Sequence, residues 1–264
     1  MADLVFENGT YKTPPDLKRH WLAAVSPTLA FYSGFSLIVF RSASLAKRGV
    51  YGYEEWRSSS VDVLRQLERA GCRFEVTGAE HLQEAGDSVV IVGNHMSMLE
   101  TMILPSLVVP FRKATFVVKQ SLIDYPVFKH VMRSRHPITV TRDNPRADLK
   151  AMLAGGVERL DAGVSIIIFP QTSRTDDFDP KQFNSIGSML ARRAKVSLVP
   201  LAIKSDAWEN GRVLKDIGRI VPSRTVRFAF GRPLRIPGKG AEEHEAVVEF
   251  IASHLDRWRA AEPG

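Results

Sequence analysis

The feature that most constrains the fold is a short apolar run, Val89–Gly93, with a histidine and a carboxylate close behind it. Four adjacent β-branched residues followed by a glycine predict a strand buried on both faces, as strands in parallel sheets are. His95 and Glu100 come directly after this strand. Because open α/β sheets bind ligands at the carboxyl ends of their strands, we expect the two side chains to lie at a site.

A histidine beside a carboxylate is the smallest general-base pair, since the carboxylate fixes the imidazole tautomer and stabilises the imidazolium. The sequence also allows a purely structural interpretation, in which Ser97 is a helix N-cap, Glu100 its capping-box partner, and His95 only a loop residue. A carboxylate that reaches back to the Ser97 N–H is not free to hold His95, so the two roles are expected to compete.

A second polar loop follows another apolar run, Val164–Phe169. It reads Pro170-Gln171-Thr172-Ser173-Arg174-Thr175, an arginine among hydroxyls and an amide. A guanidinium surrounded by short hydrogen-bond donors suits a phosphate or a carboxylate. The alternative is an exposed turn in which Arg174 pairs with one of the following acids, Asp176, Asp177 or Asp179.

Residues 71–264 alternate between strand and helix patterns, which predicts an α/β domain with a mostly parallel mixed sheet and helices on both faces. The expected strands are Phe74–Thr77, Ser88–Gly93, Ala114–Val118, Pro137–Thr141, Val164–Phe169, Val196–Ile203 and Thr225–Phe230. The expected helices are Met98–Leu107, Tyr125–Met132, Pro145–Leu160, one that ends near Ala194, and Ala241–Arg259.

Residues 1–70 differ in pattern, and we expect an irregular arm over residues 1–20 followed by a helical hairpin that associates with a membrane. The segment Trp21–Phe40 contains no charge and has basic flanks, but Pro27 interrupts it. These features favour a helix that is half-sunk in one leaflet over one that spans the bilayer, and a helix buried in the protein's own core is the alternative. The second helix is expected over Glu54–Ala70.

The net charge of +7 is uneven, with twelve Lys and Arg against three acids in residues 191–240. A basic surface suits an anionic membrane, phosphorylated substrates or nucleic acid, but no interleaved basic and aromatic motif supports nucleic acid. One cysteine rules out an internal disulfide, and the histidine spacing predicts no metal site. Acids at positions 3 and 7 do not fit a signal peptide, so we expect a membrane-associated protein on the cytoplasmic face, monotopic or peripheral through residues 20–48.

Taken together, these loops resemble those of the glycerolipid acyltransferase family, which acylates lysophosphatidic acid and related lysophospholipids. The family motif N-H-x-S-x-x-D is similar to residues 94–100, and F-P-E-G-T-R-S is similar to residues 169–175. Between them, a strand that ends on Arg142 and the earlier Lys119 match family positions, and V-P-V-A-I is similar to Val199–Ile203. The resemblance covers roughly residues 73–205, with the motifs in the family's order.

The resemblance implies an O-acyltransferase of the lysophospholipid or 1-acylglycerol-3-phosphate type, without a cofactor. His95 would be the general base oriented by Glu100, and the acyl donor would be the thioester of acyl-CoA or of acyl carrier protein. The acceptor would bind to residues matched to the family's motifs, namely Lys119, Arg142, Gln171, Thr172, Ser173 and Arg174. The implied partners are a lysophospholipid and a membrane surface with anionic lipids, and nucleic acid is not among them.

The sequence departs from the family pattern at Glu100 for aspartate, Gln171 for glutamate and Thr172 for glycine, and residues 183–187 lack the family's lysines. Since three of these changes surround the acceptor's head group, we hypothesise an acceptor other than plain lysophosphatidic acid, such as a bulkier lysophospholipid or another lipid with a free hydroxyl or amine. A different class of function, a lipid-binding protein of this fold that has lost the chemistry, is the alternative.

Overall fold

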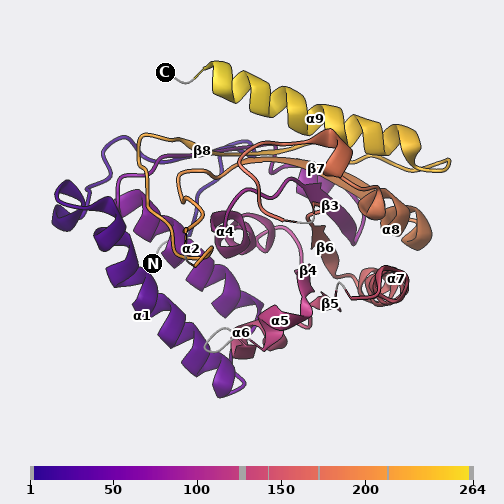
Figure 1. The fold of residues 1–264 in the computed structure, drawn as a ribbon, viewed down its shortest axis with the longest axis horizontal. Helices are drawn as coiled ribbons and strands as arrows, with labels where there is room; N and C mark the ends of the chain where they lie inside the picture. Colours follow the sequence, from indigo (N-terminus) through magenta and orange to yellow (C-terminus); the bar gives the residue numbers. More distant parts are fainter. Residues whose placement is uncertain (1–2, 125–128, 142, 172, 213, 262–264) are drawn as a thin grey trace.

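The computed structural model describes residues 3–124, 129–141, 143–171, 173–212 and 214–261 (Figure 1). These residues contain an eight-stranded sheet with strand order β1-β2-β8-β7-β3-β6-β4-β5. The strands are β1 (Tyr11–Lys12), β2 (Phe74–Thr77), β3 (Val89–Gly93), β4 (Ala114–Lys119), β5 (Ile138–Val140), β6 (Ser165–Ile168), β7 (Ser197–Lys204) and β8 (Val226–Phe230). Neighbouring strands are parallel except β1 with β2 and β7 with β8, so the predicted mostly parallel mixed sheet is confirmed.

Helices cover both faces of the sheet, as Figure 1 shows. The described helices are η1 (Trp21–Ala24), α1 (Pro27–Lys47), α2 (Tyr53–Arg69), α3 (His81–Glu84), α4 (Leu99–Val108), α5 (Gln120–Ile123), α6 (Lys129–Ser134), α7 (Pro145–Asp161), η2 (Pro180–Gln182), α8 (Ile186–Ala194) and α9 (Ala241–Ala260). Residues of α1, α2 and α4 belong to the core on one face, and residues of α7, α8 and α9 to the core on the other.

Strand β3 lies in the middle of the sheet and divides its side chains between the two cores. Val89 and Ile91 belong to the core under α2 and α4, whereas Val90 and Val92 belong to the core under α8 and α9. Successive side chains of a strand point to opposite faces, so a central strand between two apolar layers needs hydrophobic residues at every position. This requirement explains the unbroken β-branched run.

The uncharged segment Trp21–Phe40 folds as two helices because Pro27 lacks the N–H that a continuous helix would need. It stands at the first turn of α1, where that N–H is not required, and Ser26 caps the helix by accepting from Leu29 N at 3.3 Å. One side of α1 packs on the domain, where Phe31 is fully buried with its ring 4.8 Å from that of Trp208. The rest of α1 is half-buried or exposed: only 22% of its most apolar stretch is buried, and Leu29, Leu37 and Phe40 are exposed.

One expectation about secondary structure is wrong in part, and another is tested only over its second half. Residues 1–20 are not wholly irregular, because β1 pairs antiparallel with β2 and covers the edge of the sheet; two residues are too few for any periodic pattern. The helix expected over Tyr125–Met132 begins at Lys129 in the described residues, after the separate short helix α5, and Tyr125–Phe128 lie outside the described residues.

Candidate active site

The site forms where the strands β7, β3, β6 and β4 end side by side. These strands are neighbours and parallel, so their carboxyl ends meet at one edge of the sheet. The loop with His95 follows β3, the loop with Arg174 follows β6, and Ser205 follows β7. The predicted convergence of the two polar loops at this edge is confirmed.

Asn94 fixes the point at which the chain leaves the sheet. The ladder between β3 and β7 ends with Gly93 opposite Leu201. One position on, the Asn94 amide replaces the backbone, donating from Nδ2 to Ile203 O and accepting from Ile203 N, both at 2.8 Å. Because a side chain satisfies both backbone groups of Ile203, the backbone of His95 is free to turn away from the sheet.

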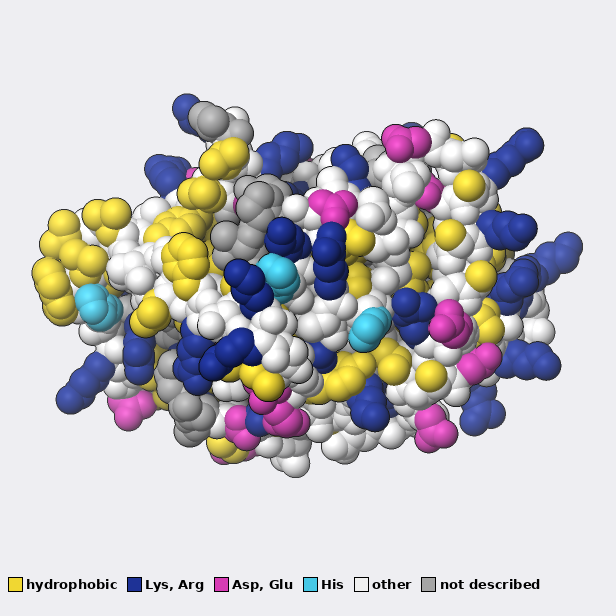
Figure 2. Space-filling view, turned by 90° about the horizontal axis from the view of Figure 1, so that it is seen from below, with side chains coloured by type: hydrophobic (Ala, Val, Ile, Leu, Met, Phe, Trp, Pro, Cys, Tyr) yellow, Lys and Arg dark blue, Asp and Glu magenta, His cyan; other side chains and the backbone are white. Residues whose placement is uncertain are grey.

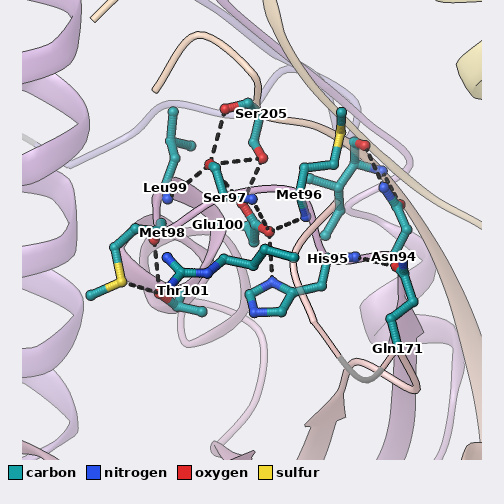
Figure 3. Close-up of polar contacts among 12 residues, drawn as sticks. Asn94, His95, Met96, Ser97, Met98, Leu99, Glu100, Thr101, Gln171 and Ser205 are labelled. Atoms are coloured by element: carbon teal, nitrogen blue, oxygen red, sulfur yellow. Dashed lines mark hydrogen bonds and ion pairs between the residues drawn. The ribbon is translucent and has the colours of Figure 1, made fainter. Parts of the chain in front are cut away.

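His95 and Glu100 make the contact that the sequence predicts. The imidazole Nδ1 donates to Glu100 Oε1 at 2.8 Å (Figure 3). A carboxylate only accepts, so Nδ1 carries a proton, and in the neutral imidazole Nε2 carries the lone pair. The face of the ring stacks on Phe169 with centroids 4.5 Å apart and planes 6° apart. In the part of the chain that the structure describes, Nε2 has no hydrogen-bond partner and is therefore the nitrogen available to a ligand.

Glu100 is fully buried and surrounded by donors. Oε1 also accepts from Met96 N at 2.7 Å and Ser97 N at 2.9 Å, while Oε2 accepts from Ser97 Oγ at 3.1 Å and Ser205 Oγ at 2.5 Å. Burial alone would raise the pKa of this carboxyl, but the hydrogen bond and charge of His95, with the Ser205 and Ser97 donors, lower it. The group is held ionised.

The expected competition between two roles of Glu100 is wrong. The same oxygen, Oε1, accepts from Ser97 N and from His95 Nδ1, because a carboxylate oxygen has room for several donors. Ser97 is not the N-cap, since α4 begins at Leu99 with Met98 at the cap position; its hydroxyl accepts from Leu99 N at 3.1 Å instead. The carboxylate of Glu100 lies between the histidine and the two serine hydroxyls.

Gln171 positions the backbone of His95. Its Oε1 accepts from His95 N at 2.6 Å, and its Nε2 donates to Thr175 Oγ1 at 3.0 Å. Thr175 N in turn donates to His95 O at 3.1 Å. The loop after β6 therefore holds both backbone groups of His95, and both polar ends of the Gln171 side chain are engaged inside the protein.

Arg174 forms an ion pair, but not with the acids that follow it in sequence. Its Nη2 donates to Asp216 Oδ1 at 2.6 Å. The second terminal nitrogen, Nη1, is buried and has no hydrogen-bond partner among the described residues. The alternative interpretation, a pair with Asp176, Asp177 or Asp179, is therefore wrong: the partner of Arg174 is Asp216, while Asp177 pairs with Arg259 of α9 and Asp179 caps η2.

A pocket of about 240 Å³ joins these groups. His95, Gln171, Arg174 and Asp216 line it, together with the predicted Lys119 at the end of β4. The rest of its lining is mainly apolar and comes from α1, α2, α4 and β4, with Phe35, Trp56, Met102 and Val117 among the residues. Ser173 is exposed, and the predicted Arg142 and Thr172 lie outside the described residues. The arrangement combines a basic nitrogen, a cation and an apolar cavity.

No sequence pattern predicted that the segment 205–220 after β7 contributes to the site. It supplies Ser205 to Glu100, Asp216 to Arg174, and Asn210, whose Nδ2 donates to Met96 O at 2.8 Å. The signal that would have revealed it is its position: it follows a strand that ends beside β3 at the same edge. Within the described residues, no cluster of three His, Cys, Asp or Glu side chains is placed to hold a metal ion.

Comparisons with known proteins identify a matching family, related sequences and a similar solved structure. A family model described as Acyltransferase matches residues 73–204. The 1-acyl-sn-glycerol-3-phosphate acyltransferase of Pseudomonas aeruginosa is 28% identical over 219 residues, which are 83% of this chain and 78% of that protein. The human 1-acyl-sn-glycerol-3-phosphate acyltransferase beta is 30% identical over 135 residues, 51% of this chain and 48% of that protein.

The fold is similar to that of a solved structure, the 1-acyl-sn-glycerophosphate (LPA) acyltransferase PlsC from Thermotoga maritima. The TM-score is 0.63 with 21% identity, over 92% of this chain and 94% of that one. The matched family region starts just before β2 and ends with β7, so it contains every strand whose carboxyl end builds the site. The chain belongs to the acyltransferase family.

Proposed function

We propose that this acyltransferase moves a fatty acyl group from an acyl thioester to the free hydroxyl of 1-acyl-sn-glycerol-3-phosphate or a closely related lysophospholipid. The observation that carries the proposal is the contact of His95 Nδ1 with the buried Glu100, which leaves Nε2 as the basic atom in an apolar pocket that also contains Arg174. A base, an anion site and an apolar cavity are what a phosphate-bearing lipid acceptor requires.

In this mechanism His95 Nε2 removes the proton of the acceptor hydroxyl, and the oxygen attacks the thioester carbonyl carbon. The C–S bond then breaks, and the thiolate takes up the proton from the imidazolium. Glu100 acts on His95 rather than on the substrates, because it holds Nδ1–H and stabilises the positive charge that develops on the ring. No acyl-enzyme intermediate forms.

Arg174 and Lys119 are the residues that would hold the acceptor's phosphate, since both are cations that line the pocket with His95. The relatives' names favour 1-acyl-sn-glycerol-3-phosphate as the acceptor. One reason for expecting a different head group no longer applies. Gln171 forms hydrogen bonds with His95 N and Thr175 Oγ1, so the presence of glutamine where the family has glutamate affects the position of His95 rather than the head-group site.

The donor is acyl-CoA or an acyl carrier protein, and its acyl chain would occupy the apolar part of the pocket between α1, α2 and β4. The enzyme would work at a membrane surface, because α1 has the length and composition of a membrane helix, with a mean hydropathy of 1.4. Leu29, Leu37 and Phe40 are 60%, 71% and 64% exposed, and Figure 2 shows hydrophobic side chains gathered at the end of the molecule where η1 and α1 begin.

Since the other side of α1 packs against Trp208, we favour an interfacial helix over a spanning one. Leu37→Asp with Phe40→Asp should greatly reduce sedimentation with vesicles that contain anionic lipids, whereas Val5→Asp should not, because Val5 is 72% exposed but lies outside the hairpin. Equal sedimentation of the two variants would contradict a role of α1 in membrane association.

A labelled acyl-transfer assay tests the enzymatic proposal. Purified protein receives radiolabelled acyl-CoA and, in separate reactions, 1-acylglycerol-3-phosphate, lysophospholipids with larger head groups, and monoacylglycerol. We expect diacyl product, fastest with 1-acylglycerol-3-phosphate, and a loss of about 10³-fold in His95→Ala. A clear preference for a larger head group would refute the acceptor assignment. Lipid binding without turnover in either protein would instead indicate the non-catalytic lipid-binding function.

A further inference from the structure

The partner of Arg174 comes from a distant part of the chain. Asp216 lies in the segment that follows β7, and its carboxylate reaches the pocket beside Arg174. The region 191–240 has only three acids among twelve cations. Asp206 and Glu209 pair with the neighbouring Lys204, Arg219 and Arg224, whereas Asp216 pairs with a residue of the site. The Arg174–Asp216 pair therefore determines which groups of Arg174 are open to a ligand in the pocket.

The Arg174–Asp216 contact is incomplete. A guanidinium can present two parallel N–H groups to a carboxylate or a phosphate, and such bidentate pairs are the strong ones. Here one carboxylate oxygen contacts one nitrogen, and Nη1 is buried without a partner in the described part of the chain. A buried donor without an acceptor is unfavourable, so a ligand that contacts both nitrogens would be favoured over Asp216.

Exposure indicates which of the two side chains is free to move. The Arg174 side chain is 17% exposed and the Asp216 side chain 37%. A carboxylate that is already partly hydrated turns into solvent at little cost in free energy. A guanidinium that lines a pocket would have to leave its packing contacts to do the same. Exchange at this pair would therefore consist of a movement of Asp216 away from a stationary Arg174.

We propose that Asp216 is a built-in competitor for the acceptor's phosphate: it occupies Arg174 in the empty enzyme, yields to the phosphate when the acceptor binds, and returns when the product leaves. The inference rests on the proposed function, because it takes Arg174 as the phosphate site. Asp216 is thus an affinity-determining residue of the acceptor site, and its ligand class is a lipid phosphate.

The competition has a consequence for turnover because acceptor and product carry the same phosphate. Acyl transfer changes a hydroxyl and leaves the phosphate as it was, so Arg174 holds substrate and product equally well. Such uniform binding lowers KM without raising kcat, and it slows the release of product. A carboxylate that competes for Arg174 weakens both complexes by the same factor and so helps the product to leave.

Calorimetric titration measures the competition without turnover. The probe is a short-chain 1-acylglycerol-3-phosphate below its micelle concentration, and the control ligand is the monoacylglycerol of equal chain length. We expect Asp216→Asn to lower the Kd for the phosphate ligand roughly fivefold, the effect of releasing one partly exposed ion pair. The Kd for monoacylglycerol, which has no phosphate to compete, should be unchanged.

Two control variants separate local competition from general charge. Asp177→Asn makes the same charge change three residues from Arg174, at a carboxylate that pairs with Arg259 and is 93% exposed. It should leave both Kd values as they are. In an Arg174→Ala background, Asp216→Asn should no longer tighten binding, because the residue for which Asp216 competes is gone.

In steady-state assays, Asp216→Asn should lower the inhibition constant of the diacylglycerol phosphate product by the same factor as the acceptor Kd, and progress curves should bend earlier. Unchanged phosphate binding in Asp216→Asn, or equal tightening in the Arg174→Ala background, would overturn the proposal. Absence of acyl transfer in the wild-type protein would refute the proposed function instead, and the calorimetric result would still decide whether Asp216 competes for the phosphate.

Discussion

The base end of the pocket (His95 and Glu100) and its acceptor end (Arg174 and Asp216) differ in how many of their polar atoms have hydrogen-bond partners. Glu100 accepts from the imidazole of His95, from two backbone amides and from two serine hydroxyls, and it is fully buried. Arg174 makes a single contact with a partly exposed carboxylate and keeps a buried nitrogen without a partner in the described residues. If the proposed function holds, the base is in place before substrate arrives, whereas substrate would complete the acceptor end.

The difference has a physical basis. Proton transfer requires fixed geometry, and preorganised dipoles around a charge avoid reorganisation during the reaction. A site that binds a charged ligand and then releases it benefits from weak internal contacts that the ligand replaces. We therefore expect changes at the base end to lower kcat, and changes at the acceptor end to alter KM for the acceptor.

The largest effect after removal of His95 itself is expected from Glu100→Gln. The amide has the same shape but no charge. Its single oxygen can face only one of the two groups of donors around Glu100, and its NH₂ group then faces the other group. We expect kcat to fall about 10³-fold with little change in KM, measured by initial rates at saturating acceptor.

Glu84→Gln is the matched control for this variant, because His81 and Glu84 form another His–Glu pair, 3.0 Å apart, outside the pocket. It should retain wild-type kcat. A loss of less than about tenfold in Glu100→Gln would show that the ionised carboxylate is not needed and would remove the contrast between the two ends.

Arg174→Ala should have the next largest effect, and it should be of the opposite kind. Loss of a charged hydrogen-bonding partner for phosphate predicts a rise of about 10- to 100-fold in KM for 1-acylglycerol-3-phosphate. The kcat value should stay within about threefold, as expected when ground state and transition state lose the same contact. Arg259→Ala, which breaks the pair with Asp177, is the control. If kcat falls and KM does not, Arg174 belongs to the base end.

The base end was predictable from sequence, because its main parts are local. His95 and Glu100 are five residues apart and follow a strand whose β-branched run fixes its place in the middle of the sheet. The number of donors at Glu100 was not predictable, since Ser205 follows a strand that lies more than a hundred residues later in the sequence. Contacts of this kind depend on strand order, which alternation of strands and helices does not specify.

The acceptor end was predictable only in part. The loop with Arg174 follows the strand pattern of β6, but its partner Asp216 lies in a segment that has no periodic pattern. Acids at positions 176, 177 and 179 are nearer in sequence, yet the fold directs two of them to other partners, Arg259 and the start of η2. Sequence proximity is a poor guide to ion pairing in loops, because the direction in which a loop leaves its strand decides which charges meet.

A smaller effect is expected from Ser205→Ala, which removes one donor to Glu100 Oε2 and leaves Ser97 Oγ in place. The kcat value should fall only severalfold, and the stability of the protein should change with pH in a defined way. The pKa of Glu100 is lowered in the folded state, so its contribution to stability is present above the unfolded value and is lost as the pH falls through the folded value.

Loss of the Ser205 hydroxyl raises the folded pKa of Glu100 and so diminishes this contribution. The free energies of unfolding of wild type and Ser205→Ala, measured by urea denaturation from neutral pH into the acid range, should therefore differ most near neutrality and approach each other as the pH falls through the lowered folded pKa of Glu100. A difference that stays constant over this range would mean that the hydroxyl only fills space.

The smallest effect is expected from Gln171→Glu, which decides to which end this residue belongs. A carboxylate oxygen can still accept from His95 N, so the backbone of the base stays in place, and only the bond from Nε2 to Thr175 Oγ1 is lost. We expect kcat and the KM for 1-acylglycerol-3-phosphate to stay within about threefold of wild type. Gln171→Ala leaves the His95 N–H without its acceptor and should lower kcat by about tenfold. A large rise in KM with either variant would place Gln171 at the acceptor's head group, and the glutamine would then again be a reason to expect a different acceptor.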